Sequence, residues 1–334
     1  MRNRLDRIVK IFRIGGKNLW LLPVMLALAS VSVLGGCKSG DIRRVKDKFT
    51  GFVFNENEAN ATKTRKLMVI GDSWAQFLTS NHTFDHLLND YGYTDYYAGS
   101  TALIGSKAYQ WAAPAALAGL TKLLLERPAT TIVVLTIGGN DLIEDWNADL
   151  SPAAADLIFD KVAADVEKIV KTITMARPNI RVVILGYDYP NLVESLKSTL
   201  NDANQKYYKR LREPTPAEVN AAIVRMGEKI NAVAQRVDRV EYVNNFGLMQ
   251  YVYGFAENGM EPYSVPFPGN HETQYQPFAG GRPDVQSPPD AMFQLPGFVD
   301  SIHLSGESYY YIGQNAMLRY IDGWLAREQS QSNR

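Results

Sequence analysis

Residues 66–77 read KLMVIGDSWAQF, and this stretch decides how the chain folds. Its first half is an apolar run that stops at a glycine, which is typical of a buried strand. Its second half starts an amphipathic pattern, so the stretch predicts a strand that turns directly into a helix. Ser73 falls at the turn, where a serine either caps the helix or is a nucleophile held at the positive end of the helix dipole. The stretch alone favours neither interpretation.

Four further strand-like runs follow, separated by amphipathic segments of helical period. The apolar runs are residues 93–98, 131–138, 181–187 and 240–244, and the amphipathic segments span about residues 74–90, 108–126, 152–176, 216–237 and 309–327. Near-continuous apolar strands that alternate with helices predict a mainly parallel sheet covered on both faces. We therefore predict the α/β class, with a single three-layer α/β/α domain over residues 65–328 and a polar tail at 329–334.

One long segment interrupts the alternation before the last helix. Residues 245–299 are rich in Pro and Gly and dense in aromatic side chains. Long aperiodic segments in compact domains are usually functional insertions or disordered loops, and disordered segments are poor in aromatics. We expect an ordered insertion, whose aromatics line an acyl channel, stack on sugar rings or simply pack against the domain.

The first 36 residues have the features of an export signal. A basic start leads into an apolar stretch at residues 19–34, which is shorter than the roughly 20 residues of a comfortable membrane span. This length favours a cleaved signal over a permanent anchor. Residues 37–64 are polar and charged, which is typical of a tether.

The only cysteine of the chain, Cys37, ends the stretch LGGC at residues 34–37. This stretch resembles the lipobox of bacterial lipoproteins, which implies cleavage before Cys37 and acylation of that residue; a free cysteine after an ordinary signal is the alternative. Acyl chains at Cys37 would attach the protein durably to a membrane. With Lys38 next to it, we expect an exported lipoprotein that faces the periplasm or the cell surface and is attached to the outer membrane.

The composition argues against several partners. Thirty-five basic residues balance 35 acidic ones, so no global field favours nucleic acid. Nothing in the chain demands a metal or an organic cofactor, and the oligomeric state is not readable.

Residues that can do chemistry follow the predicted strands, at the sheet edge where parallel sheets bind ligands. Ser73 follows the first strand, and Gly99 and Gly105 accompany the second. TIGGND, at residues 136–141, ends the third strand; there Asn140 can donate to an oxyanion, although Gly-Gly-Asn-Asp is also a good turn.

Asp300 and His303 form the other candidate pair, within FVDSIHLSG at residues 298–306. Three residues apart on a single turn, the carboxylate can lie beside the imidazole and fix its tautomer. A serine hydroxyl needs such an oriented base in order to attack. His82 and His86 look like surface residues of the first helix, so His303 is the best base.

Taken together, GDSW (Ser73), a glycine after the second strand, GGND (Asn140) and DSIH (Asp300 and His303) resemble the four marker blocks of the SGNH (GDSL-like) hydrolase family. The resemblance covers about residues 66–325 and implies an SGNH/flavodoxin-like fold. It also implies a serine esterase that cleaves an acyl ester through an acyl-enzyme.

The resemblance implies a role for each matching residue. Ser73 would be the nucleophile, His303 the general base and then acid, and Asp300 its orienting partner. The oxyanion hole would comprise the Ser73 and Gly105 backbone N–H groups and the Asn140 side chain, with Gly99 as the alternative glycine. Two departures are Trp74, in place of the usual leucine, and the poorly defined second block.

Other readings remain open on the sequence. GDSWA nearly matches the nucleophile elbow of α/β-hydrolases, but Ala75 stands where a glycine is needed and too few strands precede it. GNHE at residues 269–272 resembles one block of metallophosphoesterases without the other ligands of a two-metal site. A non-catalytic binding module and an acyltransferase are the remaining alternatives.

The sequence does not identify the substrate, because one fold can act on many different esters. Membrane attachment slightly favours an ester of the cell envelope, such as a lysophospholipid or an acetylated glycan.

Overall fold

The computed structural model describes residues 62–262 and 281–332. The predicted signal peptide, Cys37, most of the tether, the GNHE block and residues 333–334 lie outside these ranges. In the described part of the chain, no helix is both long and apolar enough to cross a membrane.

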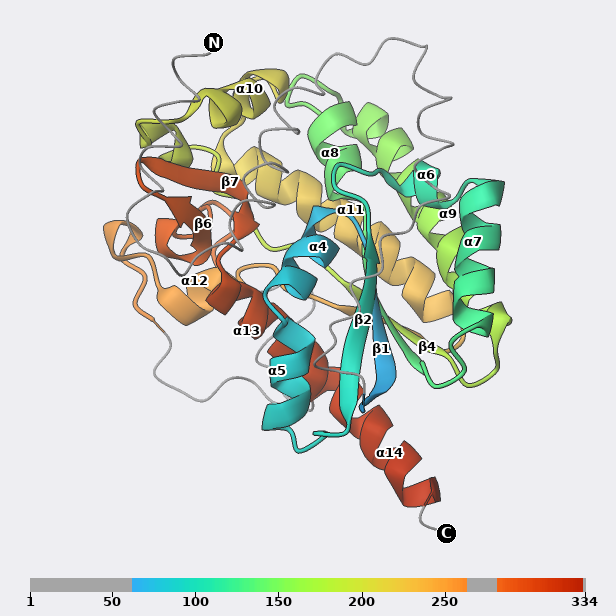
Figure 1. The fold of residues 1–334 in the computed structure, drawn as a ribbon. Coiled ribbons are helices and arrows are strands. Elements are labelled where there is room, and N and C mark those ends of the chain that lie inside the picture. Colours follow the sequence, from blue (N-terminus) through green and yellow to red (C-terminus); the bar gives the residue numbers. More distant parts are fainter. Residues whose placement is uncertain (1–61, 263–280, 333–334) are drawn as a thin grey trace, which may run out of the picture. The chain divides into compact units, whose positions relative to one another are not determined.

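The centre of the fold is a five-stranded parallel sheet (Figure 1). Its strands are β1 (Thr64–Gly71), β2 (Tyr96–Ala102), β3 (Ile132–Thr136), β4 (Arg181–Leu185) and β5 (Val240–Val243). The strand order is β2-β1-β3-β4-β5, so the chain moves from β1 to one side and then crosses back to the other. This reversal beside β1 is the switch point at which open α/β sheets bind their ligands. The predicted three-layer α/β/α fold with a mainly parallel sheet is confirmed.

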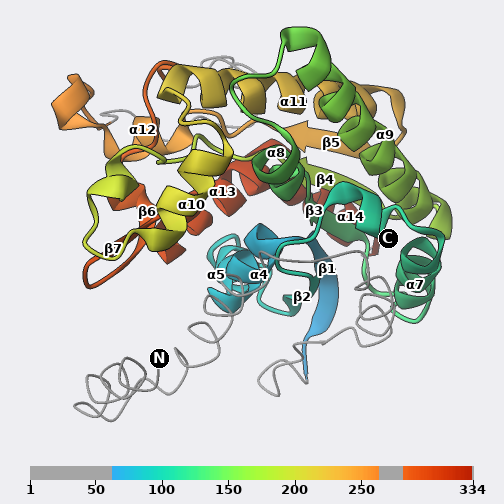
Figure 2. The same ribbon diagram turned by 90° about the horizontal axis from the view of Figure 1, so that it is seen from above.

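Helices cover both faces of the sheet (Figure 2). On one face α7 (Pro114–Leu125), α9 (Pro152–Ala176) and α11 (Pro216–Arg236) pack against alternate strand residues such as Ile70, Leu135 and Ile184. On the other face α4 (Ser73–Ser80), α5 (Thr83–Asp90), α13 (Gly306–Ala316), a π-helical segment η5 (Met317–Ile321) and α14 (Asp322–Ser332) pack against the intervening residues, such as Val69 and Val134. This alternation is the strand period of two, applied to a sheet buried on both sides.

Local signals set where the two longest helices begin. The Ser151 side chain caps α9, and Thr215 forms a capping box with Glu218 at the start of α11. A proline at the first helical position follows each cap, where its missing N–H leaves no hydrogen bond unmade. The predicted spans of 152–176 and 216–237 agree with these helices to within one residue.

Two predicted helices are divided in the structure, and a third is continuous but contains a π-helical segment. The predicted helix 74–90 divides into α4 and α5 at His82, whose φ of 51° lies in the left-handed region. The segment 108–126 divides into α6 (Ala108–Trp111) and α7, because Pro114 begins a new helix. The last helix continues from α13 into α14 through η5.

Other elements differ from the prediction or were not predicted. Strand β2 begins three residues later and ends four residues later than the expected 93–98. The segment after β3 forms α8 (Gly139–Asp145), and the segment after β4 forms η2 (Glu194–Lys197) and α10 (Asp202–Arg210).

The predicted insertion contains regular structure in its described part. Its elements are α12 (Leu248–Tyr253), η3 (Ala256–Asn258), η4 (Pro289–Ala291) and β6 (Met292–Leu295). Strand β6 pairs antiparallel with β7 (Phe298–Leu304), away from the main sheet (Figure 1). This hairpin carries Asp300 and His303.

Candidate active site

In the turn between β1 and α4, one residue caps the helix and the next residue presents a hydroxyl to the site. Asp72 occupies the N-cap position, and its Oδ1 accepts the backbone N–H of Trp74 at 2.9 Å. Ser73 is the first residue of the helix and is only 7% exposed. Its Oγ lies 2.9 Å from Nε2 of His303. Ser73 is therefore not the cap of α4, and its hydroxyl faces an imidazole from a distant part of the chain.

An irregular stretch of β7 brings Asp300 and His303 together. The β6–β7 register shifts over these residues, and Asp300 Oδ1 accepts the N–H groups of Ile302 at 2.8 Å and His303 at 2.9 Å. Its Oδ2 lies 3.0 Å from Nδ1 of His303. The expected single turn is thus an Asp-stabilised irregularity in a strand, held by side-chain to backbone hydrogen bonds.

The environment keeps Asp300 ionised and makes His303 basic. Burial alone raises the pKa of Asp300, but the charge and hydrogen bond of His303 and two backbone N–H groups bring it below its usual value. Burial lowers the pKa of His303, but Asp300, through its charge and hydrogen bond, and the charge of Asp72 together raise it above 6.5. An ionised partner and a basic imidazole suit general-base chemistry.

Trp74 connects α4, which carries Ser73, with β7, which carries Asp300 and His303. Its indole N–H donates to the carbonyl of Ile302 at 3.2 Å, and its ring packs edge-on against Tyr187 and Tyr309. This residue, which departs from the usual leucine of the marker block, therefore holds β7 against the helix that carries Ser73.

Asn140 lies close to the serine turn at the start of α8. Its Nδ2 donates to the carbonyl of Ser106 at 3.0 Å and lies 3.5 Å from Oδ2 of Asp72. Gly105 directly precedes Ser106 and has a φ of 74°, in the left-handed region that favours glycine. The Gly105 turn and Asn140 are thus neighbours at the strand ends.

Gly99 occupies a different position from Gly105. It pairs with Met68 in the middle of β2, whereas the end of that strand, Ala102, pairs with Gly71. A Cβ at Gly99 would lie 2.6 Å from Nε of Arg65, which shows that this position faces the arginine. Of the two glycines, only Gly105 follows the end of the strand.

A buried network not anticipated from the sequence supports the turn. The Tyr187 hydroxyl donates to Asp72 Oδ2 at 2.5 Å and accepts the N–H of Gly139. Burial raises the pKa of Asp72 to about 6, against the lowering effect of Tyr187 and Trp74. Burial likewise raises the pKa of Asp141, which accepts the Ala108 N–H, to about 7. Tyr187 is the last residue of the predicted strand run 181–187, so its place at a strand end was the available signal.

A pocket opens beside Ser73 and His303 and encloses about 570 Å³, including its mouth. Asp72, Asn140 and Tyr187 also line it, together with apolar side chains of α8 and α11. Within the described residues, no three His, Cys, Asp or Glu side chains are grouped as a metal site.

The chain matches the model of a known family over residues 63–316, described as GDSL-like lipase/acylhydrolase. It belongs to this family. As a GDSL-like acylhydrolase the protein is an ester-bond hydrolase, and the predicted family is confirmed. A search of curated proteins finds no match.

Several solved structures are similar to this GDSL-like protein at low identity. A lipase from a goat rumen metagenome is 10% identical, with 77% of this chain and 98% of that chain covered and a TM-score of 0.44. The carbohydrate acetylesterase Est24 from Sinorhizobium meliloti is 12% identical, with 78% and 99% covered and a TM-score of 0.44. A family 3 carbohydrate esterase from Clostridium thermocellum is 17% identical, with 79% and 98% covered and a TM-score of 0.39. These similarities do not bear on the substrate.

Proposed function

We propose that the protein is a serine esterase in which Ser73 is the nucleophile, His303 the general base and Asp300 its orienting partner. One observation carries the proposal: a continuous chain of contacts runs from Asp300 Oδ2 to His303 Nδ1 at 3.0 Å and from His303 Nε2 to Ser73 Oγ at 2.9 Å. All three residues are at least nine-tenths buried. Three residues from two distant parts of the chain meet in the order that nucleophilic catalysis requires.

The reaction proceeds through an acyl-enzyme. Ser73 Oγ attacks the ester carbonyl carbon while its proton passes to Nε2 of His303, and Asp300 stabilises the imidazolium. The bond from carbon to the alcohol oxygen then breaks, and the alcohol leaves with the proton from Nε2. Water attacks the acyl-serine with His303 again as the base, which releases the carboxylic acid and restores Ser73.

Three donors stabilise the negatively charged oxygen of the tetrahedral intermediate in this proposal. They are the backbone N–H groups of Ser73 and Gly105 and the Nδ2 group of Asn140. The hydrogen bond from Nδ2 to the Ser106 carbonyl supports this assignment, because it fixes the amide beside the Gly105 turn. The other Nδ2 hydrogen faces Asp72 Oδ2 at 3.5 Å, and in this proposal the oxyanion replaces that long contact.

Covalent labelling tests the nucleophile. We expect a fluorophosphonate probe to add one adduct to the purified full-length chain, measured by intact mass, and Ser73→Ala to abolish it. Ser80→Ala is the matched control, because Ser80 lies on the same helix but outside the contact chain. Labelling that survives Ser73→Ala, or folded protein that is not labelled, would refute the mechanism; the second result would favour the binding-module reading.

We also propose that the protein is exported and lipid-anchored at Cys37. The basic start, the apolar stretch at residues 19–34 and the LGGC sequence support this. In a bacterial host we expect the wild-type chain to incorporate labelled fatty acid and to fractionate with membranes, whereas Cys37→Ala does neither. Equal membrane association of both chains would contradict the proposal.

A further inference from the structure

The Tyr187 hydroxyl joins the two turns that carry the proposed nucleophile and the proposed side-chain oxyanion donor. It donates to Oδ2 of Asp72, the residue before Ser73, at 2.5 Å, and it accepts the backbone N–H of Gly139, the residue before Asn140. Tyr187 also lines the pocket beside Ser73. One phenol oxygen therefore contacts both turns, and no step of the proposed reaction uses it.

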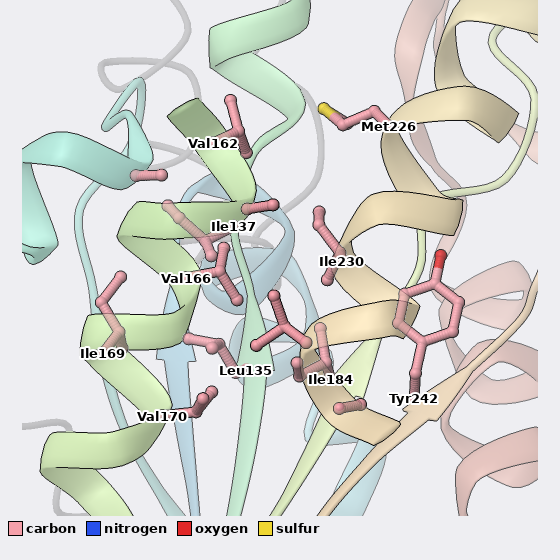
Figure 3. Close-up of a cluster of buried hydrophobic side chains, with 14 of the residues drawn as sticks. Leu135, Ile137, Val162, Val166, Ile169, Val170, Ile184, Met226, Ile230 and Tyr242 are labelled. Atoms are coloured by element: carbon pink, nitrogen blue, oxygen red, sulfur yellow. The ribbon is translucent and has the colours of Figure 1, made fainter. Parts of the chain in front are cut away.

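The backbone that leads into Tyr187 is firmly held. Strand β4 ends two residues earlier, and its Ile184 is buried in the apolar layer between the sheet and the helices α9 and α11 (Figure 3). The N–H of Gly186 donates to the Val243 carbonyl at 2.9 Å, and the Gly186 carbonyl accepts Nδ2 of Asn245 at 2.7 Å. Main-chain contacts on both sides of Gly186 therefore fix the point from which the tyrosine side chain starts.

The ring of Tyr187 also packs closely on both turns. Its centroid lies 4.8 Å from that of Trp74, with the two planes at 70°. A Cβ at Gly139 would lie 2.9 Å from Cζ and 3.2 Å from the hydroxyl of Tyr187, so only a glycine lets the phenol approach the start of α8 this closely. Ring packing and hydrogen bonds together hold the hydroxyl in place.

Oδ2 of Asp72 is the atom for which Tyr187 and Asn140 compete. The Asn140 amide lies 3.5 Å from this oxygen, whereas its hydrogen bond to the Ser106 carbonyl is 3.0 Å long. Asp72 is only 1% exposed, and a buried carboxylate oxygen is costly to leave without a donor. If the Tyr187 hydroxyl is removed, the Asn140 amide is a donor that already faces this oxygen and can close onto it.

We propose that Tyr187 is a positioning residue for the oxyanion hole: by donating to Oδ2 of Asp72, it keeps the second Nδ2 hydrogen of Asn140 available to the oxyanion. This inference rests on the proposed serine esterase function. A contact that matters only when the oxyanion forms lowers kcat and kcat/KM equally and leaves KM unchanged.

The test is steady-state hydrolysis of p-nitrophenyl acetate by the full-length chain, with kcat divided by the concentration of Ser73 that a fluorophosphonate labels at completion. We expect Tyr187→Phe to lower kcat about tenfold and to change KM less than about twofold, because it weakens one oxyanion donor. Tyr93→Phe is the matched control. It removes another phenol-to-carboxylate hydrogen bond, from the Tyr93 hydroxyl to Asp322 Oδ1 at 2.7 Å before β2, and should retain the wild-type kcat.

A double-mutant cycle separates positioning of Asn140 from general support of the fold. If Tyr187 acts through Asn140, then Tyr187→Phe should lower kcat no more than about twofold in a chain that already carries Asn140→Ala, whereas independent effects would multiply.

Two analogues of similar size isolate the donor itself. Replacement of Tyr187 by p-aminophenylalanine keeps an N–H donor at the same place and should give a kcat within about threefold of wild type. Replacement by p-methylphenylalanine fills the same space without a donor and should lower kcat as Tyr187→Phe does. The p-methylphenylalanine chain also takes the place of Tyr187→Phe in the cycle if that variant does not fold.

The outcomes distinguish this inference from the esterase function. A wild-type kcat in folded Tyr187→Phe, or losses that multiply with those of Asn140→Ala, would overturn the role of Tyr187 while Ser73-dependent labelling still stands. A rise in KM with kcat unchanged would mean that Tyr187 binds the substrate, and would overturn it too. Absence of both labelling and ester hydrolysis in the wild-type chain would overturn the esterase function and this inference together.

Discussion

At the scale of single residues, the helix start has two roles, and two neighbouring side chains fill them: Asp72 caps the helix and Ser73 presents its hydroxyl. Asp72 caps α4 through Trp74 N–H, so the hydroxyl of Ser73 can contact His303 instead. The Asp72 carboxylate also accepts from Tyr187 and lies 3.5 Å from the Asn140 amide. One buried carboxylate thus joins the serine turn to the side chain proposed as an oxyanion donor.

Removing that donor gives the first prediction. We expect Asn140→Ala to lower kcat at least tenfold, because losing one oxyanion donor typically removes about 3–4 kcal/mol of transition-state stabilisation. Steady-state kinetics on an ester substrate measures the effect, and thermal unfolding verifies that the variant is folded. An unchanged kcat in folded protein would exclude Asn140 from the mechanism.

The raised pKa of His303 gives the second prediction. The base must be neutral to act, so kcat/KM rises with pH through the folded pKa, which lies above 6.5. Asp300→Asn removes the main charge that raises this pKa, so we expect the midpoint to move to lower pH and kcat to fall by on the order of 10³–10⁴. His86→Gln is the control, since His86 is exposed. Flat activity from pH 5 to 9 would count against His303.

At the scale of elements, the carboxyl ends of β1 and β3 approach so closely that only glycine fits between them. Gly71 pairs with Thr136, has a φ of 147°, and a Cβ there would lie 1.8 Å from the Thr136 carbonyl oxygen. Gly71, two residues before Ser73, therefore allows β1 to end against β3 and α4 to begin directly afterwards.

The third prediction compares two glycines of positive φ, one crowded by backbone and one with open space around it. We expect Gly71→Ala to destabilise the fold by ~3 kcal/mol or more, because the new methyl group meets backbone, and to abolish fluorophosphonate labelling. Gly92→Ala, with a φ of 84° and open space around the new Cβ, should destabilise by only about 1 kcal/mol. Urea unfolding measures both, and equal destabilisation would refute the clash.

Features that are encoded by neighbouring residues could be predicted from the sequence, whereas features that depend on contacts between distant elements could not. Helices α9 and α11 were predicted to within one residue because their caps and prolines lie next to their ends. Ser73, Asn140, Asp300 and His303 were identifiable because each sits in a short block of distinct composition. Tyr187 and the wall of the pocket were not, because their importance arises only when β4, α8 and α11 meet. The irregular β7 likewise depends on its pairing with β6.

At the scale of the whole molecule, buried carboxyl groups link stability to pH. Burial raises the pKa of Asp72 to about 6 and that of Asp141 and Asp188 to about 7, despite the hydrogen bonds that each accepts. In the unfolded chain these groups titrate near 3.8, so between that pH and 6 to 7 the folded protein binds more protons. Stability therefore falls as pH rises through this window. His303 acts in the same direction above pH 6.5, because its raised pKa contributes stability only while it is protonated.

The fourth prediction follows from this fall in stability with rising pH. We expect the free energy of unfolding, measured by urea titration of the full-length chain, to be at least ~2 kcal/mol lower at pH 8 than at pH 5, since one pKa unit corresponds to about 1.4 kcal/mol. Asp141→Asn removes one of the buried charges and keeps an acceptor for the Ala108 N–H, so its pH dependence should be shallower. Asp149→Asn, at a side chain that is 73% exposed, should retain the wild-type slope. Stability that is constant or rises between pH 5 and 8 would contradict this prediction. It would mean that the carboxyl groups of Asp72, Asp141 and Asp188 are solvated or paired with a charge in the folded state.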